Sequence, residues 1–204
     1  MPRVPHPRRA AERGFTLIET LVVLGIAVVI VMSGWMFQLT PIWNNARAES
    51  ALQTTLGTVQ WAREAAIDQR TVINVTFVAP NTLQVYTGAC TGGTLLSTIP
   101  LPTDMAFQIV SGIPTANTPD GMGSGSNAID FGYPGSSTGG QDYLCFQQDG
   151  RNFDSSNRVS SGVVYIARQN DLSSIHAVSV LGATGRVKGW RLVSVNGTQG
   201  WIFE

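Results

Sequence analysis

An uncharged apolar run near the start of the chain limits what the rest of the molecule can do. It extends from Leu21 to Leu39, nineteen residues that are mostly Val, Ile, Leu, Met, Ala and Trp. A helix rises about 1.5 Å per residue, so this run is roughly 28 Å long, close to the hydrocarbon thickness of a bilayer. The sequence therefore predicts a membrane helix. Glu19 stands at its edge, where an ionisable side chain is costly and marks a candidate functional residue.

The charges on either side of the run predict its orientation. Four arginines lie between residues 3 and 13, and no Lys or Arg follows until Arg47. The positive-inside rule keeps the N-terminus in the cytoplasm and sends the C-terminal part across the membrane. Residues 38–44, which follow the run, lack the small-residue pattern of a secretory cleavage site. We therefore expect any cut to lie before the run, which leaves the helix in the mature protein.

The junction before the run carries a resemblance to a known family. Gly14, followed by Phe15-Thr16-Leu17-Ile18-Glu19, resembles the class III signal of type IV prepilins and type II secretion pseudopilins. The resemblance implies that a prepilin peptidase cuts after Gly14 and that the amine of Phe15 becomes methylated. It also implies that Glu19 pairs with the N-terminal amine of a neighbouring subunit during assembly. Stabilisation of a first-turn Glu by the helix dipole is the alternative, but it does not explain the Gly-Phe junction.

The remaining chain predicts one long helix followed by strands. The helix is expected over 15–70, and after Pro41 apolar residues recur every three or four positions: Ala48, Leu52, Leu56, Val59, Ala62 and Ala66. A period-two pattern begins at Ile73, and Pro80-Asn81 suggests a hairpin turn before 83–86. Further strands are expected at 105–110, 127–131, 143–148, 163–168, 176–181 and 186–193, with loops at 111–126 and 132–140.

This order of elements predicts the fold class and the division of the chain. Strands that follow a single long helix favour an α+β fold with an antiparallel sheet, here pilin-like, with the second half of the helix packed on the sheet. We expect a leader over 1–14, a transmembrane or filament-core helix over 15–40, and a periplasmic globular domain over 41–204. The protein would then sit in the inner membrane as a single-pass protein before it enters a filament.

Three segments resemble one group of minor pilins, the GspH/FimT group. They are Gln60–Ile67 with the strand after it, Phe146–Arg151 with the Ser-rich stretch and Val163–Ile166 that follow, and Gly185-Arg186-Val187. The resemblance implies a minor pilin or pseudopilin that enters a type IV pilus or a type II secretion pseudopilus, in the initiating or tip complex. Its expected partners are other pilin or pseudopilin subunits, the prepilin peptidase and the inner membrane.

Two cysteines, Cys90 and Cys145, lie in the part of the chain predicted to be exported. In an oxidising compartment an even number of cysteines favours a disulfide. Two separate buried thiols remain the alternative.

A basic segment near the end of the chain suggests a second function. If 186–193 is a strand, Arg186, Lys188 and Trp190 share one face, and Arg191 projects from the other. Cations beside an aromatic ring suit DNA phosphate contact and base stacking. Some members of the GspH/FimT group are DNA receptors in natural transformation, and this segment is similar to their Gly-Arg-x-Arg element, with Lys188 at its last position. A solvated edge strand protected by basic residues is the structural alternative.

Other classes of function find little support in the sequence. The leader contains four Arg and Glu12, so the mature chain keeps nine basic and twelve acidic residues, which gives no general attraction to nucleic acid. His176, the only histidine outside the leader, lies in an alternating strand, and the sequence lacks a Gly-x-Ser-x-Gly or His-Glu-x-x-His motif. We therefore expect no enzyme activity, no cofactor and no metal site.

Overall fold

The computed structural model describes residues 16–133, 140–195 and 197–204, without the side chains of 33–42, 44 and 195. The chain divides into two compact units, Met1–Ile42 and Trp43–Glu204. One helix, α1 (Leu17–Asp68), continues through the boundary between them. The expectation of a single long helix over 15–70 is therefore confirmed within two residues at each end.

The second half of α1 is amphipathic, as its periodicity predicts. Ala48, Leu52, Val59, Ala62 and Ala66 are almost completely buried, and Leu56 is partly buried against the same core. Two threonines on this face avoid an unsatisfied hydroxyl because each donates to a carbonyl one turn earlier, Thr55 to Ala51 and Thr58 to Thr54.

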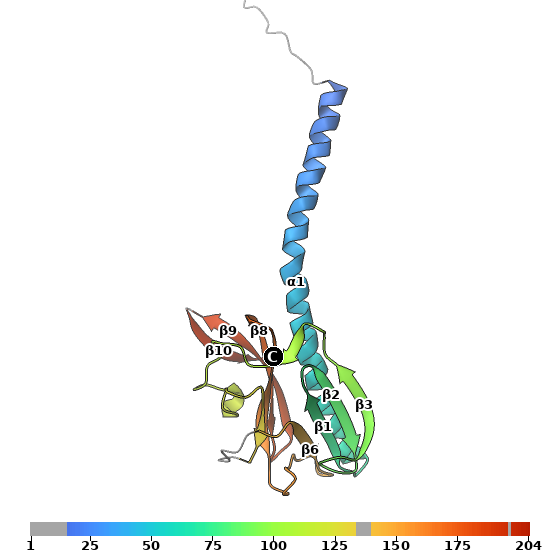
Figure 1. The fold of residues 1–204 in the computed structure, drawn as a ribbon, viewed down its shortest axis with the longest axis vertical. Coiled ribbons are helices and arrows are strands. Elements are labelled where there is room, and N and C mark those ends of the chain that lie inside the picture. The colour runs from blue at the N-terminus through green and yellow to red at the C-terminus, as the bar shows by residue number, and fades with distance from the viewer. Residues whose placement is uncertain (1–15, 134–139, 196) are drawn as a thin grey trace, which may run out of the picture. The chain divides into compact units, whose positions relative to one another are not determined.

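In the part of the chain that the structure describes, ten strands follow the helix and form two antiparallel sheets (Figure 1). The strands are β1 (Ile73–Val78), β2 (Thr82–Thr87), β3 (Thr94–Pro100), β4 (Met105–Phe107), β5 (Ile129–Gly132), β6 (Tyr143–Phe146), β7 (Ser161–Arg168), β8 (Asp171–Leu181), β9 (Arg186–Val195) and β10 (Thr198–Phe203). The first sheet has the order β3-β2-β1-β6. The second has the order β10-β9-β8-β7-β4, and β5 also pairs with β7.

The two faces of the larger sheet pack against different parts of the chain. On the helix side, Val164, Ile166, Val178 and Val180 join the residues of α1 and the first sheet in the main core. On the opposite side, which we call the outer face, Tyr165, Ile175, Ala177 and Leu192 form a second cluster with Val110 and Ile113 of the loop after β4. The loop continues through a short 3-10 turn, Pro119–Gly121, before β5. The larger sheet is therefore covered on both sides.

The α+β class with antiparallel sheets is confirmed, and two details of the prediction are wrong. The expected single sheet is two sheets, and strands β3 and β10 were not anticipated. Both are edge strands. β3 is almost entirely exposed, and β10 contains Gly200, so neither shows the apolar alternation that marks a strand with one buried face.

Candidate functional site

The first turn of α1 presents Glu19 to solvent. Thr16 caps the turn, because its hydroxyl oxygen accepts from the backbone N–H of Glu19 at 3.3 Å while its carbonyl oxygen accepts from the same N–H at 3.0 Å. The Glu19 side chain is exposed, and none of the described cations lies within ion-pair distance of it. Gly14 and Phe15, the predicted cleavage and methylation residues, lie outside the described residues.

The helix after Glu19 exposes apolar side chains on every side. Leu21, Val23, Leu24 and Val29, which point in different directions around the helix, are each more than 60% exposed. A helix that is apolar all round normally lies in a membrane or inside an assembly. Among the described residues, no helix reaches the length and hydropathy of a membrane span. Residues 33–39 of the predicted span belong to the part whose side chains are not described.

The predicted DNA-binding residues lie on β9. Arg186, Lys188 and Trp190 point to the outer face, and Lys188 lies over the rings of both Trp190 and Phe203, at 5.2 Å and 5.8 Å from their centroids. The indole N–H of Trp190 donates to Ser179 Oγ at 2.8 Å. These three side chains therefore form one surface, which we call the β9 basic patch.

A carboxylate from a distant loop neutralises much of this patch. Asp120, in the 3-10 turn, accepts from Arg186 Nη2 at 2.7 Å and from Lys188 Nζ at 3.1 Å. Burial opposes the ionisation of Asp120, but the hydrogen bonds and charges of Lys188 and Arg186 outweigh it and hold the pKa of Asp120 below its usual value. Asp120 is only 15% exposed, whereas Arg186 remains 48% exposed.

Arg191 does not belong to the β9 basic patch. It lies opposite His176 in the register of β8 and β9, and its Nε pairs with Glu204 Oε1 at 3.0 Å. Glu49 of α1 approaches the same point, with Oε2 3.7 Å from His176 Nε2. The structure thus separates Arg191 from the other three predicted residues and places it in a cluster of two carboxylates and a histidine.

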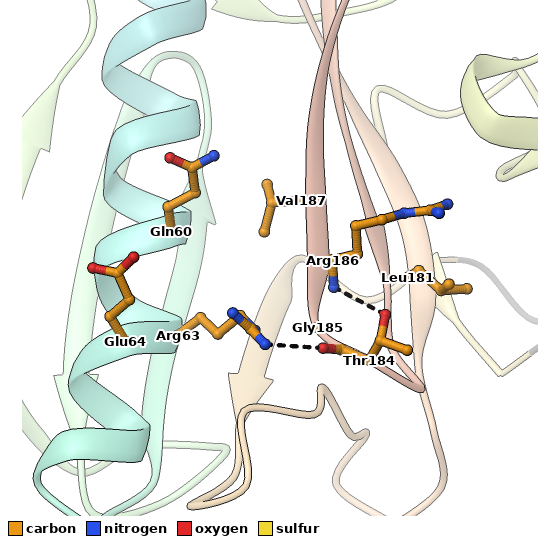
Figure 2. A pocket seen from close by; sticks show the side chains of 8 residues that line it. All are labelled: Gln60, Arg63, Glu64, Leu181, Thr184, Gly185, Arg186 and Val187. Atoms are coloured by element: carbon orange, nitrogen blue, oxygen red, sulfur yellow. Dashed lines mark hydrogen bonds between the residues drawn. The ribbon is translucent and has the colours of Figure 1, made fainter.

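A surface cavity of about 670 Å³ opens between α1 and the turn that joins β8 to β9 (Figure 2). Its helix wall is formed by Gln60, Arg63 and Glu64. Arg63 donates to the carbonyl oxygens of Gly150 and Thr184, at 3.3 Å and 3.2 Å, so this guanidinium ties the helix to two loops. Figure 2 shows the Arg186 side chain turned away from the helix. The described lining residues bring together no pairing of nucleophile and general base.

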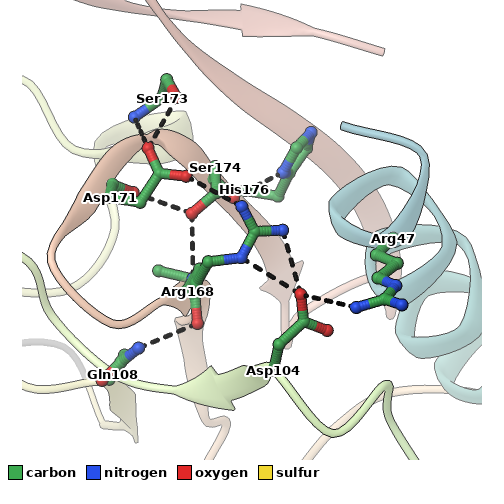
Figure 3. A network of polar contacts seen from close by, with 9 residues as sticks. Arg47, Asp104, Gln108, Arg168, Asp171, Ser173, Ser174 and His176 are labelled. Carbon is green, nitrogen blue, oxygen red and sulfur yellow. Dashed lines mark hydrogen bonds and ion pairs between the residues drawn. The ribbon is translucent and has the colours of Figure 1, made fainter. Parts of the chain in front are cut away.

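A polar network joins α1 to the β7–β8 turn (Figure 3). Arg168 pairs with Asp104 at 3.0 Å and with Asp171 at 3.2 Å, and Arg47 of α1 lies 3.5 Å from the same Asp104. The backbone N–H of Arg168 donates to Ser174 Oγ. Burial opposes the ionisation of Asp104, but its backbone hydrogen bond and the nearby arginines lower its pKa. These contacts fix the turn beside His176 and serve a structural role.

Cys90 and Cys145 are joined by a disulfide. Cys145 is the third residue of β6 and is completely buried, while Cys90 lies in the loop after β2. Asn74, opposite Cys145 in the β1–β6 register, donates its side-chain amide to the Cys90 carbonyl. The bridge therefore attaches the β2–β3 loop to the edge strand of the first sheet.

Sequence reasoning missed the partners of these residues. Asp120 lies 66 positions from its partner Arg186. Glu49 and Glu204 lie 127 and 28 positions from His176, which both of them approach. Asp120 has positive φ (57°) in a Gly-rich loop, which gives no signal of a specific partner. Only the sheet register together with the loop path brings these carboxylates to their partners.

Comparison with known proteins identifies the N-terminal segment. Residues 9–34 match the family described as the prokaryotic N-terminal methylation motif, and the match includes Gly14, Phe15 and Glu19. No curated protein and no solved structure matches the chain.

Proposed function

We propose that this chain, whose residues 9–34 carry the class III prepilin signal of type IV pilin-like proteins, is a minor pilin or pseudopilin. The signal implies processing by a prepilin peptidase, anchoring in the membrane and later assembly with other pilins. The observation that carries the proposal is Glu19, which projects from the first turn of a helix whose apolar side chains are exposed on all sides. Such a surface needs either lipid or the helices of other subunits around it.

We infer a route from the membrane to the filament from this exposed apolar helix. The helix is held in the inner membrane with the leader in the cytoplasm and the domain from Trp43 to Glu204 in the periplasm. After cleavage it leaves the bilayer and packs in the core of a type IV pilus or a type II secretion pseudopilus. The Glu19 carboxylate docks against the methylated amine of Phe15 in a neighbouring subunit, and the sheet domain faces outward. The role is structural and not enzymatic.

Membership of the GspH/FimT group and a place in the initiating or tip complex are the finer parts of the proposal. Gln60–Ile67 forms the last turns of α1 before β1, and Gly185 precedes β9, which are the positions that the resemblance expects. Both features support the group assignment.

Replacement of Glu19 by Ala tests the proposal in cells. The leader should still be cleaved and the protein should still reach the membrane fraction, because the apolar run is unchanged. Incorporation into sheared filaments should fall about tenfold or more, because an unpaired charge at membrane depth costs roughly 2.5–3.5 kcal/mol and the variant loses the pairing in the filament that relieves this cost. Thr20→Ala is the matched control, because the Thr20 hydroxyl donates to the carbonyl oxygen of Leu17 in its own turn. Normal incorporation of the Glu19 variant would contradict the docking mechanism.

A DNA receptor for natural transformation is the second candidate, supported by the cluster of Lys188, Trp190 and Phe203 beside the exposed Arg186. Asp120 opposes it by neutralising two cations. In this hypothesis Asp120→Asn should tighten salt-sensitive binding of duplex DNA by residues 43–204. The combined change of Arg186 and Lys188 to Ala should abolish it. If the unaltered domain and Asp120→Asn both fail to bind at low salt, the candidate is wrong.

A further inference from the structure

Three side chains that could bind a metal converge on the helix side of the larger sheet. Glu49 comes from α1, His176 from β8, and Glu204 follows β10. One ligand atom of each lies within 4.8 Å of the other two. The His176 side chain is only 5% exposed, whereas those of Glu49 and Glu204 are 45% and 20% exposed. The cluster therefore has a buried nitrogen at its base and partly open oxygens at its mouth.

The hydrogen bonding of His176 determines which nitrogen is available. Its Nδ1 lies 3.0 Å from the carbonyl oxygen of Ser174, and a carbonyl can only accept, so Nδ1 carries a hydrogen. Burial lowers the pKa of His176 and favours the neutral ring, although the Ser174 carbonyl and Glu49 act in the opposite direction. In the neutral ring Nε2 has a free lone pair, and this nitrogen faces Glu49. A backbone carbonyl on the opposite nitrogen is the usual support of a metal-binding histidine.

The carboxylates of Glu49 and Glu204 lie side by side, each with an oxygen within 4.8 Å of the other and of a His176 ring nitrogen. Burial, the charge of Glu49 and a hydrogen bond with Glu49 raise the pKa of Glu204, and only Arg191 opposes this rise. Arg191 holds Glu204 through Oε1. Three ligand atoms, one nitrogen and two carboxylate oxygens, therefore meet at one place on the surface of the domain.

We propose that Glu49, His176 and Glu204 form a binding site for a divalent transition metal of the Zn²⁺ class. Zn²⁺ accepts both imidazole nitrogen and carboxylate oxygen as ligands, whereas Ca²⁺ and Mg²⁺ prefer oxygen alone. Zinc bonds of about 2.0–2.2 Å put tetrahedral ligand atoms about 3.4 Å apart. The 3.7 Å between Glu49 Oε2 and His176 Nε2 is already close to that separation, and rotation of the partly exposed Glu204 brings in the third ligand.

A metal at this point would join three elements that are far apart in the sequence. It would fasten the end of the β9–β10 hairpin to α1 through Glu204 and Glu49, with His176 as the fixed anchor on the central strand β8. β10 is an edge strand of its sheet and pairs only with β9 among the described strands. The inference concerns the domain from Trp43 onward and does not depend on the proposed role in a filament.

The test uses residues 43–204, because every buried core residue of the described chain lies within this range. His176 is its only histidine and both cysteines are in the disulfide, so few competing soft ligands remain. Zn²⁺ should bind with one equivalent by calorimetry and raise the Tm, Co²⁺ should give a d–d absorption band, and the imidazole Nε2 resonance should shift in NMR while Nδ1 keeps its hydrogen.

Glu204→Gln is the decisive variant, and its Tm without metal is measured beside that of the unaltered domain because the change also removes the ion pair with Arg191. It should weaken Zn²⁺ binding at least tenfold, as should Glu49→Gln. Glu64→Gln, an exposed carboxylate of the same helix, is the matched control and should bind normally. No binding of Zn²⁺ at millimolar concentration, binding that Glu204→Gln leaves unchanged, or equal affinity for Ca²⁺ would each overturn the proposal.

Discussion

Two aspartates build the same local motif at different depths. Asp149 accepts from the backbone N–H and the Nε of Arg151, and Asp154 accepts from the same two groups of Arg158 and also from the N–H of Ser156. The Asp154 side chain is 2% exposed and that of Asp149 is 47% exposed. Burial opposes the ionisation of Asp154, but the hydrogen bonds from Arg158 and Ser156 outweigh it and lower its pKa.

We expect Asp154→Asn to lower the free energy of unfolding by about 1–3 kcal/mol at pH 7, because buried donors lose a charged acceptor. The folded-state pKa of Asp154 lies below the unfolded value, so its contribution is present above about pH 4 and is lost as the pH falls through the folded-state pKa. Urea unfolding of residues 43–204 at pH 7 and at steps down to pH 3 would measure this.

The matched variant for that experiment is Asp149→Asn, which should cost much less because its donors can bond to water instead. The gap between the wild-type protein and Asp154→Asn should narrow in acid. A constant gap at all pH values, or equal losses for the two variants, would show that the charge of Asp154 is not what stabilises the loop.

At the scale of elements, the turn between β8 and β9 depends on one glycine. Gly185 has φ of 64°, and a Cβ there would collide with the Gly150 carbonyl and lie 2.6 Å from Arg63 Nε. The close approach lets Arg63 reach the Gly150 and Thr184 carbonyls. The turn is therefore fitted to the helix as well as to the hairpin.

We expect Gly185→Ala to be much more destabilising than Gly197→Ala. Gly197 also has positive φ (80°), but a Cβ there would meet nothing within 4 Å. Both variants pay about 1–2 kcal/mol for a left-handed alanine, and only Gly185→Ala adds a collision worth about 1–3 kcal/mol more. Denaturant unfolding of the two variants side by side measures the difference. Equal losses would mean that the backbone around Gly150 moves aside easily.

The elements also show which features could be predicted from sequence. The buried stripe of α1 and the β1–β2 hairpin follow local periodicity and a turn signal, so they were predicted correctly. β3 and β10 are strands because they pair with β2 and β9. Their own local sequences contain no signal of this pairing. The pairing of Asp120 could not be predicted for the same reason. Its position depends on a loop that packs on the outer face, where Val110 and Ile113 are buried.

At the scale of the whole molecule, the site residues divide in the same way. The N-terminal signal is local, so Gly14, Phe15 and Glu19 could be recognised together, and the family match covers them. The pairing of Arg186 and Lys188 with Asp120, and the meeting of Glu49, His176 and Glu204, require the complete fold. Sequence reasoning consequently could not foresee that Asp120 pairs with two of the basic residues of β9.

The disulfide should stabilise the whole domain, because it closes a long loop of the chain. The cysteines are 55 positions apart, and β3, β4 and β5 lie between them. Closing such a loop stabilises a protein by about 4 kcal/mol on the chain-entropy estimate. The β1–β6 pairing and the hydrogen bond from the Asn74 amide to the Cys90 carbonyl would remain after reduction, so the fold should survive.

We expect the double change Cys90→Ser and Cys145→Ser to lower the free energy of unfolding by about 2–4 kcal/mol. Reductant should produce the same loss in the wild-type domain and none in the double variant. A loss below about 0.5 kcal/mol would mean that the unfolded chain already holds these segments together.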